Sequence, residues 1–384
     1  MPSSAAPAIL QVVPALDAGG VERTTIDIAA ALARAGFTAL VASEGGRLEP
    51  ELRAAGGELI SLQAASKSPL TIAGNIARLT AVVRGRGVKL VHARSRAPAW
   101  SASMAARRAH VPFVTTYHGI YNAGNPVKRL YNSVMARADA VIANSEWTAR
   151  HVRAEHRVAP GKLHVIPRGV DLARFDPGGF APDRVAGQRA AWGAGDDDIV
   201  VLLPGRLTRW KGQRVLIDAL ALLRRDGMLG NIRAVMTGDA QGRAGYEGEL
   251  RAALAAAGLD GRATLLGHTS DMPLAYLAAD IVLSASTDPE AFGRVAAEAG
   301  AMGRPVIATD HGGARETVVA GETGLLARPG DARDLAQAIA ALAGLDAQAR
   351  AEMGARGRAH IVARYSLERM CADTLAVYRG LIGA

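Results

Sequence analysis

The stretch ILQVVPALDAGGVERTTIDIAAALARAGFTALVAS, residues 9–43, decides the fold class. Its apolar run 9–13 has the length of a buried strand, and residues 21–35 follow with the periodicity of an amphipathic helix. Gly36 ends that helix, and a second apolar run begins at Thr38. A strand, a helix and a strand in this order are typical of a parallel sheet that is covered by helices on both faces.

The same alternation continues through both halves of the chain. The first half contains further apolar runs of strand length at residues 59–62, 90–93, 113–117, 140–143 and 163–166. The second half contains them at residues 199–203, 232–237, 264–266, 281–284, 305–308 and 324–327. From residue 331 onward the pattern is helical only. We therefore predict an α/β protein with two Rossmann-like, doubly wound domains, whose ligands bind beyond the carboxyl ends of the strands.

A passage rich in proline and glycine, residues 167–195, separates the two series of strands. Such passages are typical of domain boundaries, and 384 residues is a suitable length for two domains. We expect domains at residues 1–180 and 181–360. We expect residues 361–384 to form a helix that packs back toward the first domain.

Cysteine usage and hydropathy indicate the compartment. The single cysteine, Cys371, excludes an internal disulfide and a cysteine-built metal site, and it favours a reducing compartment. Residues 1–19 carry no basic segment ahead of their apolar run, so we expect a strand there and not a signal peptide. No stretch has the length and hydropathy of a membrane span. We expect a cytoplasmic protein, with peripheral membrane contact at most.

Positive charge is concentrated in the first half of the chain. The net charge is +9, and residues 1–180 hold 22 lysines and arginines against 12 acids. Residues 59–138 contain 12 of these cations and no acid at all. Solvated helix faces explain scattered arginines, but they do not explain a stretch of this length without a carboxylate. The asymmetry therefore indicates an anionic partner of the first domain.

The loop PGRLTRWKG, residues 204–212, follows the strand at 199–203 and precedes a helix that begins near Gln213. Its three cations, Arg206, Arg209 and Lys211, and the free amides of the helix start can surround a diphosphate. A solvated basic turn is the alternative interpretation of this loop taken alone.

The segment DPEAFGRVAAE, residues 288–298, follows the strand at 281–284 and places two glutamates eight positions apart around a helix start. If helical, eight residues separate Glu290 from Glu298 by roughly 12 Å along the axis, so one extended ligand with two hydroxylated groups can contact both. The alternative is an acid that balances the helix dipole and an unrelated surface glutamate.

These motifs and their context resemble the retaining glycosyltransferase family 4, whose members have the GT-B fold of two Rossmann-like domains that face each other across a cleft. The resemblance extends over nearly the whole chain. Its motifs are Gly19–Glu22, Tyr117–Gly119, Asn144–Ser145, Ile166–Asp171, Gly205–Arg206, Lys211–Gly212, Pro289–Gly293, Glu298–Ala308, Gly312–Glu316 and Gly321–Leu326.

The resemblance implies an acceptor-binding first domain and a second domain that binds a nucleotide sugar. The residues it places on the donor are Arg206 and Lys211 for the diphosphate, Glu298 for the ribose, and Glu290, Phe292 and Gly293 for the transferred sugar. Gly19 and Gly20 would close over the phosphates from the first domain, and His118 would approach the sugar at the catalytic centre. His268 lies at the position that contacts the base. Asn144, Ser145 and residues 312–316 are equally explained as turn and capping residues.

The charge that develops on the leaving group during the reaction predicts the mechanism. As the bond from sugar to phosphate breaks, Arg206, Lys211 and helix amides can stabilise the leaving diphosphate. We therefore expect neither a metal ion nor a cofactor. The acids Asp196–Asp198 precede a strand instead of following one, and we expect them to form a solvated linker. The resemblance favours a UDP-sugar as donor, with GDP-mannose next.

The basic first domain indicates an anionic glycan or lipid acceptor, such as lipopolysaccharide core, and peripheral contact with the anionic inner face of the cell membrane through residues 71–86. A nucleotide-sugar 2-epimerase of the same fold is the alternative enzyme. A nucleic-acid-binding protein would also be basic, but no recognition motif appears, so we expect no nucleic acid partner. A dinucleotide-dependent oxidoreductase would need a Gly-x-Gly-x-x-Gly fingerprint, which neither glycine-rich turn supplies.

Overall fold

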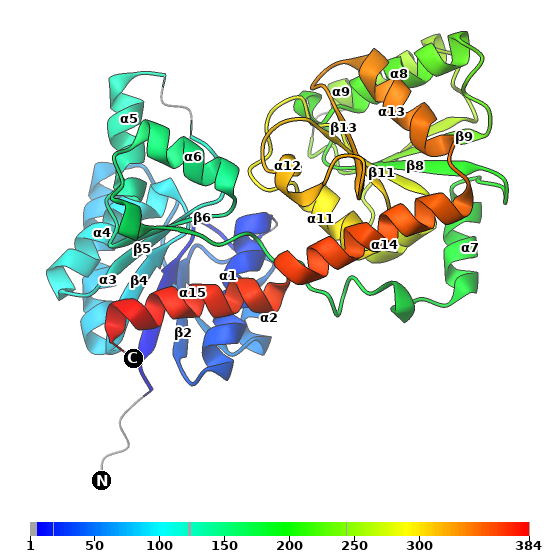
Figure 1. Cartoon of the computed structure of the whole chain (residues 1–384). Coiled ribbons are helices and arrows are strands. Elements are labelled where there is room, and N and C mark those ends of the chain that lie inside the picture. Colours follow the sequence, from blue (N-terminus) through cyan, green and yellow to red (C-terminus); the bar gives the residue numbers. More distant parts are fainter. Residues whose placement is uncertain (1–5, 18, 122–123, 243, 384) are drawn as a thin grey trace. The chain divides into compact units, whose positions relative to one another are not determined.

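The computed structural model describes residues 6–17, 19–121, 124–242 and 244–383. The chain divides into two compact units (Figure 1). The first unit comprises residues 1–169 and 367–384, and the second unit comprises residues 170–366.

This division differs from the expected boundaries at 180/181 and 360/361. Residues 170–180 join the second unit because the amide of Val170 donates to the carbonyl of Tyr365 (2.7 Å), and Val170 also forms a β-bridge with Ser366. Phe175 packs in the core of the same unit. The chain therefore enters and leaves the second unit at neighbouring points.

The first unit is built on a parallel sheet of seven strands in the order β3-β2-β1-β4-β5-β6-β7. The strands are β1 (Ala8–Val12), β2 (Thr38–Ser43), β3 (Gly57–Ser61), β4 (Val88–Ala93), β5 (Phe113–Tyr117), β6 (Ala140–Ala143) and β7 (Leu163–Val165). The helices are α1 (Gly20–Arg34), α2 (Glu49–Ala54), α3 (Pro69–Gly85), α4 (Arg96–Ala109), α5 (Pro126–Ser133), α6 (Glu146–Glu155) and α15 (Leu367–Ile382).

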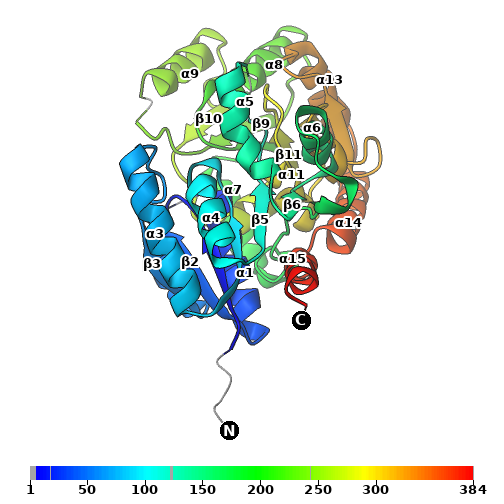
Figure 2. The ribbon, with the colours of Figure 1, turned by 90° about the vertical axis from the view of Figure 1, so that its left-hand side faces the viewer.

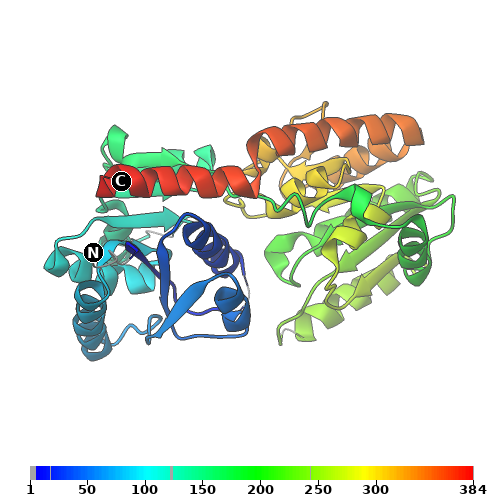
Figure 3. The same cartoon turned by 90° about the horizontal axis from the view of Figure 1, so that it is seen from below.

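Alternation along β1 explains the layers of this unit. Leu10 and Val12 pack with α3 and α4, which lie in front of the strands in Figure 2. Ile9 points to the opposite face and packs with α1 and α15. Figure 3 shows α15, in red, extending along the first unit. The last helix thus belongs to the first unit, because its buried face completes the core there.

The second unit is built on a parallel sheet of six strands in the order β10-β9-β8-β11-β12-β13. The strands are β8 (Ile199–Pro204), β9 (Ile232–Thr237), β10 (Ala263–Leu266), β11 (Ile281–Ser284), β12 (Val306–Thr309) and β13 (Gly324–Ala327). The helices are α7 (Pro182–Ala191), α8 (Gln213–Arg225), α9 (Ala244–Ala256), α10 (Met272–Ala278), α11 (Arg294–Ala301), α12 (Ala314–Thr317), α13 (Ala332–Ala343) and α14 (Ala347–Arg364).

Helices α8, α9 and α13 cover one face of this sheet, and α7, α10, α11 and α14 cover the other. The predicted fold class is therefore confirmed: both units are doubly wound parallel α/β structures. Each strand predicted from an apolar run is present, with bounds that agree within two residues.

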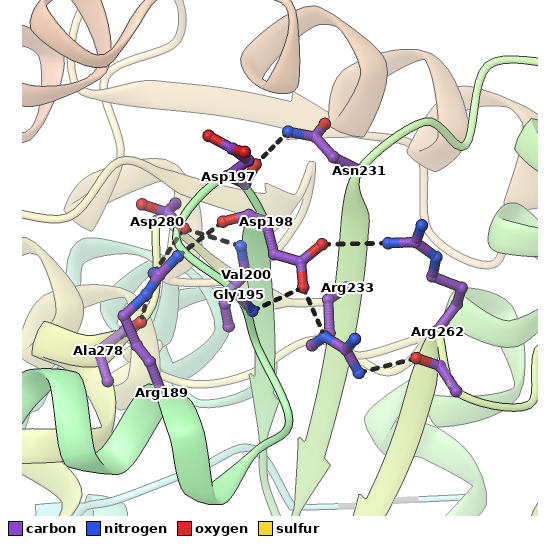
Figure 4. Close-up of polar contacts among 11 residues, drawn as sticks. Arg189, Gly195, Asp197, Asp198, Val200, Asn231, Arg233, Arg262, Ala278 and Asp280 are labelled. Carbon is purple, nitrogen blue, oxygen red and sulfur yellow. Dashed lines mark hydrogen bonds and ion pairs between the residues drawn. The ribbon is translucent and has the colours of Figure 1, made fainter.

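Of the acids before β8, Asp196 and Asp197 are exposed, as expected for a solvated linker, but Asp198 differs. Asp198 is largely buried, with 13% of its side chain exposed, and it forms ion pairs of 3.0 Å with both Arg233 and Arg262. It also accepts from the Gly195 amide (2.9 Å). Figure 4 shows this network at the amino ends of the strands. Asp198 is thus a structural ion-pair centre.

A second pair extends the network to helix α7. Arg189 donates to Asp280 (2.9 Å), to the carbonyl of Ala278 (3.0 Å) and to the carbonyl of Asp198 (2.6 Å). Asp280 also accepts from the amide of Val200 (2.8 Å). These contacts hold α7 against the start of β8 and β11. They lie at the amino ends of the strands, whereas the loops of the candidate site follow the carboxyl ends.

Candidate active site

The candidate site of the second unit lies at the carboxyl ends of β8 and β11. These strands are neighbours in the sheet, and the strand order reverses between them. Ligands of doubly wound sheets bind at such a switch point. The loop that follows β8 contains Arg206 and Lys211, and the loop that follows β11 contains Glu290. The topology therefore brings both predicted motifs to one place.

Close backbone contact holds the loop after β8 in position. Gly212 has φ 80°, and a Cβ atom there would lie 2.0 Å from the carbonyl oxygen of Ala285, so the position requires glycine. The fully buried Gln213 donates from its side chain to the carbonyl of Arg206 (3.1 Å). Helix α8 begins at Gln213, as predicted, and no side chain caps its first turn. Its free amides can bind an anion.

Lys211 and Glu290 form the centre of the site. The Nζ atom of Lys211 lies 2.6 Å from Oε1 of Glu290, and the two side chains are 14% and 15% exposed. The hydroxyl of Ser286 donates to the same carboxylate oxygen (2.5 Å), and the ammonium lies 4.4 Å from the ring centroid of Trp210. Two motifs that are 79 positions apart in the sequence thus share one hydrogen-bond cluster.

The electrostatics of this cluster keep Glu290 ionised. Burial raises the pKa of Glu290, but the charge of Lys211 and the hydrogen bonds from Lys211 and Ser286 outweigh it, so the pKa lies below its usual value. The carboxylate can therefore accept hydrogen bonds from sugar hydroxyls at neutral pH, while Lys211 offers further donors to a phosphate.

Glu298 lies closer to the helix start than the sequence suggested. Helix α11 begins only at Arg294, with Gly293 before it in the left-handed conformation (φ 83°), so the segment from Glu290 to Glu298 is not one helix. The separation expected for eight helical residues does not apply. Tyr276 donates its hydroxyl to Glu298 (2.9 Å), and Arg294 lies 3.4 Å from the same carboxylate. Both contacts orient Glu298 for hydroxyl groups of a ligand.

The other predicted residues of the second unit differ in exposure. Arg206 is exposed, and among the described residues its guanidinium has no hydrogen-bond or ion-pair partner, which leaves it available for an anion. His268 is exposed in the loop after β10. Phe292 is buried, with its ring edge-on to Tyr365 (5.6 Å between centroids), so only its backbone can face a ligand.

The first unit has its own switch point, between β1 and β4. Gly19 and Gly20 follow β1 and begin α1, and His118 follows β5. A Cβ atom at Gly20 would lie 2.0 Å from a guanidinium nitrogen of Arg168, so the arginine packs directly against this turn. The structure thus brings the predicted first-unit residues to one edge of the sheet.

His118 is held as a neutral ring. Burial lowers its pKa well below the usual value, and the charges of Arg94 and Arg168 lower it further. Its Nε2 atom is buried without a hydrogen-bond partner among the described residues. A neutral imidazole with an unused nitrogen can exchange a hydrogen bond with a substrate hydroxyl.

Three residues of these clusters were missed in the sequence. Arg94 is the first residue after β4 and Ser286 the second after β11, and this position next to a switch point is the signal that would have found them. Arg168 belongs to the motif 166–171, to which no role had been given. Ser145, in contrast, is the cap of α6 that was foreseen as its alternative: it accepts from the amide of Thr148 (3.0 Å).

Comparison with known proteins identifies the family. The model described as Glycosyltransferase Family 4 matches residues 18–174, and the one described as Glycosyl transferases group 1 matches residues 186–360. The D-inositol 3-phosphate glycosyltransferase of Jonesia denitrificans is 32% identical over 306 residues, which are 75% of this chain and 71% of that protein. The chain belongs to glycosyltransferase family 4. The predicted family and enzyme class are confirmed.

Solved structures agree with this assignment. A glycosyltransferase from Rickettsia africae is similar to this glycosyltransferase with a TM-score of 0.90 and 34% identity, covering 98% of this chain and 99% of that one. Anabaena HepE in complex with UDP and glucose has a TM-score of 0.84 and 26% identity, covering 98% and 100%. These likenesses extend the fold assignment over both units.

Two other kinds of feature, a metal site and a membrane span, can be judged over the described ranges. Within them, no three His, Cys, Asp or Glu side chains gather in a group that would suit a metal ion. None of the helices in the same ranges combines the length and the hydropathy that crossing a bilayer requires.

Proposed function

We propose that this glycosyltransferase moves a sugar from a UDP-sugar to an anionic glycan or lipid acceptor, with retention of configuration and without a metal ion. The observation that supports the donor site best is the Lys211–Glu290 pair beside the uncapped start of α8. One cation, one carboxylate and a set of free amides meet there, and these are the groups that a sugar diphosphate needs.

The proposed chemistry follows from where charge develops. When the glycosidic bond to phosphate breaks, negative charge grows on the departing diphosphate, and Lys211, Arg206 and the α8 amides stabilise it. Glu290 accepts hydrogen bonds from the sugar and stays ionised beside Lys211. His118, a neutral ring, positions a sugar hydroxyl. The acceptor attacks on the face that the diphosphate leaves, and the phosphate oxygen takes its proton.

A uridine donor is favoured by the structural relative that was solved with UDP and glucose. The test is thermal unfolding of the purified protein with UDP, GDP and ADP. A ligand at a hundred times its dissociation constant adds about 2.7 kcal/mol to the free energy of unfolding. We expect the largest shift with UDP. A shift with GDP alone would move the donor to GDP-mannose, and no shift with any of the three would contradict the donor site.

Activity assays address the remaining parts of the proposal. Incubation of the donor with and without acceptor separates transfer from 2-epimerisation, because an epimerase converts the donor alone. We expect equal transfer rates in EDTA and in Mg²⁺, since Arg206, Lys211 and the helix amides neutralise the leaving group. A rate that depends on Mg²⁺ would contradict a metal-free reaction.

The charge of the first unit supports an anionic acceptor. This unit contains 23 lysines and arginines against 12 acids, and the second unit contains 22 against 24. The relative from Jonesia denitrificans is named for D-inositol 3-phosphate, a phosphate ester. A lipopolysaccharide core that carries phosphate belongs to the same chemical class. Transfer to a phosphorylated acceptor and to its dephosphorylated form, compared under one donor concentration, tests this part.

We also propose peripheral contact with an anionic bilayer, and we place this contact on α5 instead of on the predicted segment 71–86. In α3, Arg78 and Arg84 donate to backbone carbonyls, and Arg86 pairs with Glu58 (2.5 Å). Helix α3 exposes Leu70 (85%) just before this segment, and helix α5 exposes Val127 (75%) and Leu130 (58%) beside Lys128 and Arg129, of which Arg129 pairs with Glu155 (3.3 Å). Exposed apolar side chains beside cations are typical of membrane-surface helices.

A further inference from the structure

Buried polar side chains lie at alternate positions near the carboxyl ends of β4 and β5 in the first unit. His92 and Arg94 follow Leu90, and Thr116 follows Val114. Leu90 and Val114 belong to the apolar core that α15 completes. His92, Arg94 and Thr116 are at most 4% exposed. Because buried polar groups weaken a core unless hydrogen bonds satisfy them, the elements that cover this face have to supply polar partners.

Helix α15 supplies such a partner through Tyr378. The ring of Tyr378 is 1% exposed and packs in the apolar core just described. Its hydroxyl lies 2.5 Å from Nδ1 of His92, and it also forms a hydrogen bond with the guanidinium of Arg94. The Nε2 atom of His92 lies 2.8 Å from the hydroxyl oxygen of Thr116. Residues of α15, β4 and β5, together with Arg94, thus form one chain of hydrogen bonds.

The chemistry of these groups fixes the direction of the chain. A guanidinium can only donate, so the hydroxyl oxygen of Tyr378 accepts from Arg94. Burial raises the pKa of Tyr378 to about 12, so the hydroxyl keeps its proton and donates it to Nδ1 of His92. Burial also lowers the pKa of His92 well below 6.5, so the ring is neutral, carries its proton on Nε2 and donates it to Thr116. Loss of the Tyr378 hydroxyl would therefore break both hydrogen bonds on the Arg94 side of the chain.

The chain ends next to His118, the residue predicted for the catalytic centre. His118 lies two positions after Thr116 in the sequence. Besides burial, the charge of Arg94 lowers the pKa of His118, which places this guanidinium near the imidazole. Arg94 is held from its other side by Gln11 of β1, which accepts from Nε (2.7 Å). The guanidinium is thus fixed between β1 and α15 beside His118.

We propose that Tyr378 is a positioning residue of the catalytic centre, because its hydroxyl, held between Arg94 and His92, fixes the side chains that surround His118. The last helix of the chain then contributes to the reaction as well as to the core. This inference rests on the proposed function, in which His118 positions a sugar hydroxyl. Tyr378 acts through other side chains, so loss of its hydroxyl should lower the rate of transfer. The affinity for the nucleotide should not change, since its proposed phosphate ligands belong to the second unit.

Kinetics of Tyr378→Phe test this role, because phenylalanine keeps the packed ring and removes only the hydroxyl. We expect kcat for sugar transfer to fall about tenfold, as for a slightly misplaced catalytic group, and the Kd for UDP to stay unchanged. The matched control is Thr374→Val, which removes another buried hydroxyl of α15, one that donates to the carbonyl of Met370 in the same helix (2.8 Å). It should change neither quantity. An equal fall of kcat in both variants would overturn the positioning role.

Nitrogen-15 NMR spectra of the histidine rings test the inference without donor or acceptor. The wild-type spectrum should show His92 with a protonated Nε2 and an unprotonated Nδ1, and the variants His92→Gln and His118→Ala assign the signals. In Tyr378→Phe the signals of both rings should shift, whereas in Thr374→Val neither should. If Tyr378→Phe does not fold, Thr116→Val breaks the chain at its other end and should also shift the His118 signals.

The two measurements separate the inference from the proposed function. Unchanged His118 signals, or a wild-type kcat, in folded Tyr378→Phe would overturn the inference. Absence of sugar transfer by the wild-type protein would count against the proposed function alone, because the NMR spectra are recorded without substrates.

Discussion

The two switch points of the molecule differ in how their charged side chains are paired. In the second unit, Lys211 and Glu290 are paired at 2.6 Å before any ligand binds. In the first unit, Arg94 is buried with one guanidinium nitrogen unbonded, beside a neutral His118. We propose that the paired site stabilises its own loops and binds a diphosphate, and that the unbonded groups of the first unit bind a substrate group. A substitution should therefore affect both stability and activity in the second unit, but mainly ligand binding in the first.

The largest effect is expected from Lys211→Ala. Transfer should fall by about a thousandfold, because the leaving diphosphate loses its nearest cation. The free energy of unfolding should fall by about 1–3 kcal/mol, since Glu290 is left buried without its main partner. Steady-state kinetics and urea unfolding measure the two quantities.

Two controls sharpen this prediction. Lys211→Met combined with Glu290→Gln should regain stability without regaining activity, because neither charge remains unpaired. Arg214→Ala on the exposed face of α8 should change neither quantity. Undiminished turnover in Lys211→Ala would remove the phosphate role of this residue.

The next effect concerns His118. His118→Ala should lower kcat by about 10- to 100-fold, as expected for the loss of one buried hydrogen bond to substrate. Because burial holds the pKa of His118 well below 6.5, the ring is neutral at neutral pH. The wild-type rate should show no inflection near pH 6.5 that depends on this residue. An inflection that disappears in His118→Ala would contradict the neutral role.

A smaller effect is expected at the amino ends of the strands in the second unit, where Asp198 lies. Asp198→Asn should cost about 3 kcal/mol of stability, because Arg233 and Arg262 lose their shared carboxylate. UDP binding should not change, since the network lies at the amino ends of the strands. The exposed Asp196→Asn is the control. Weaker UDP binding in Asp198→Asn alone would mean that the amino and carboxyl ends of the strands are energetically coupled.

The wild-type protein and Asp198→Asn also allow a test of how stability depends on pH. Burial raises the pKa of Asp198, but the Gly195 amide and Arg233 outweigh it, so the folded-state pKa lies below 3.8. A lowered pKa stabilises the fold above the unfolded value, and this stabilisation is lost as pH falls through the folded value. The stability difference between wild type and Asp198→Asn should therefore be constant above about pH 5 and shrink below pH 4. A difference that grows on acidification would contradict this.

The smallest effect concerns the membrane. Leu130→Asp should reduce sedimentation with anionic liposomes about three- to tenfold, because one apolar contact is replaced by a repelled charge. Leu70→Asp, on the exposed part of α3, is the matched control and should have less effect. A larger loss with Leu70→Asp would assign the contact to α3, which contains most of the predicted segment 71–86, and equal binding of all three proteins would exclude both helices.

Much of the fold was predictable because strands and helices are encoded over short distances. Each apolar run became a strand, and the loop 204–212 and the start of α8 lie where the sequence placed them. The helix start that was predicted between Glu290 and Glu298 lies at Arg294, but the left-handed conformation of Gly293 just before it was not foreseen. Periodicity does not report the backbone angle of a single glycine.

The sequence by itself determined the alternation of strands and helices and the family, and it supplied the residues that we propose to bind the donor, since all of these depend on local patterns and contiguous motifs. Only the tertiary structure decided that Lys211 pairs with Glu290, that Asp198 is a buried ion-pair centre and that Arg94 has no anionic partner within the described chain. The same holds for the unit boundary at Val170, which depends on a hydrogen bond to Tyr365. These features depend on contacts between residues far apart in the chain, and such contacts exist only after the chain has folded.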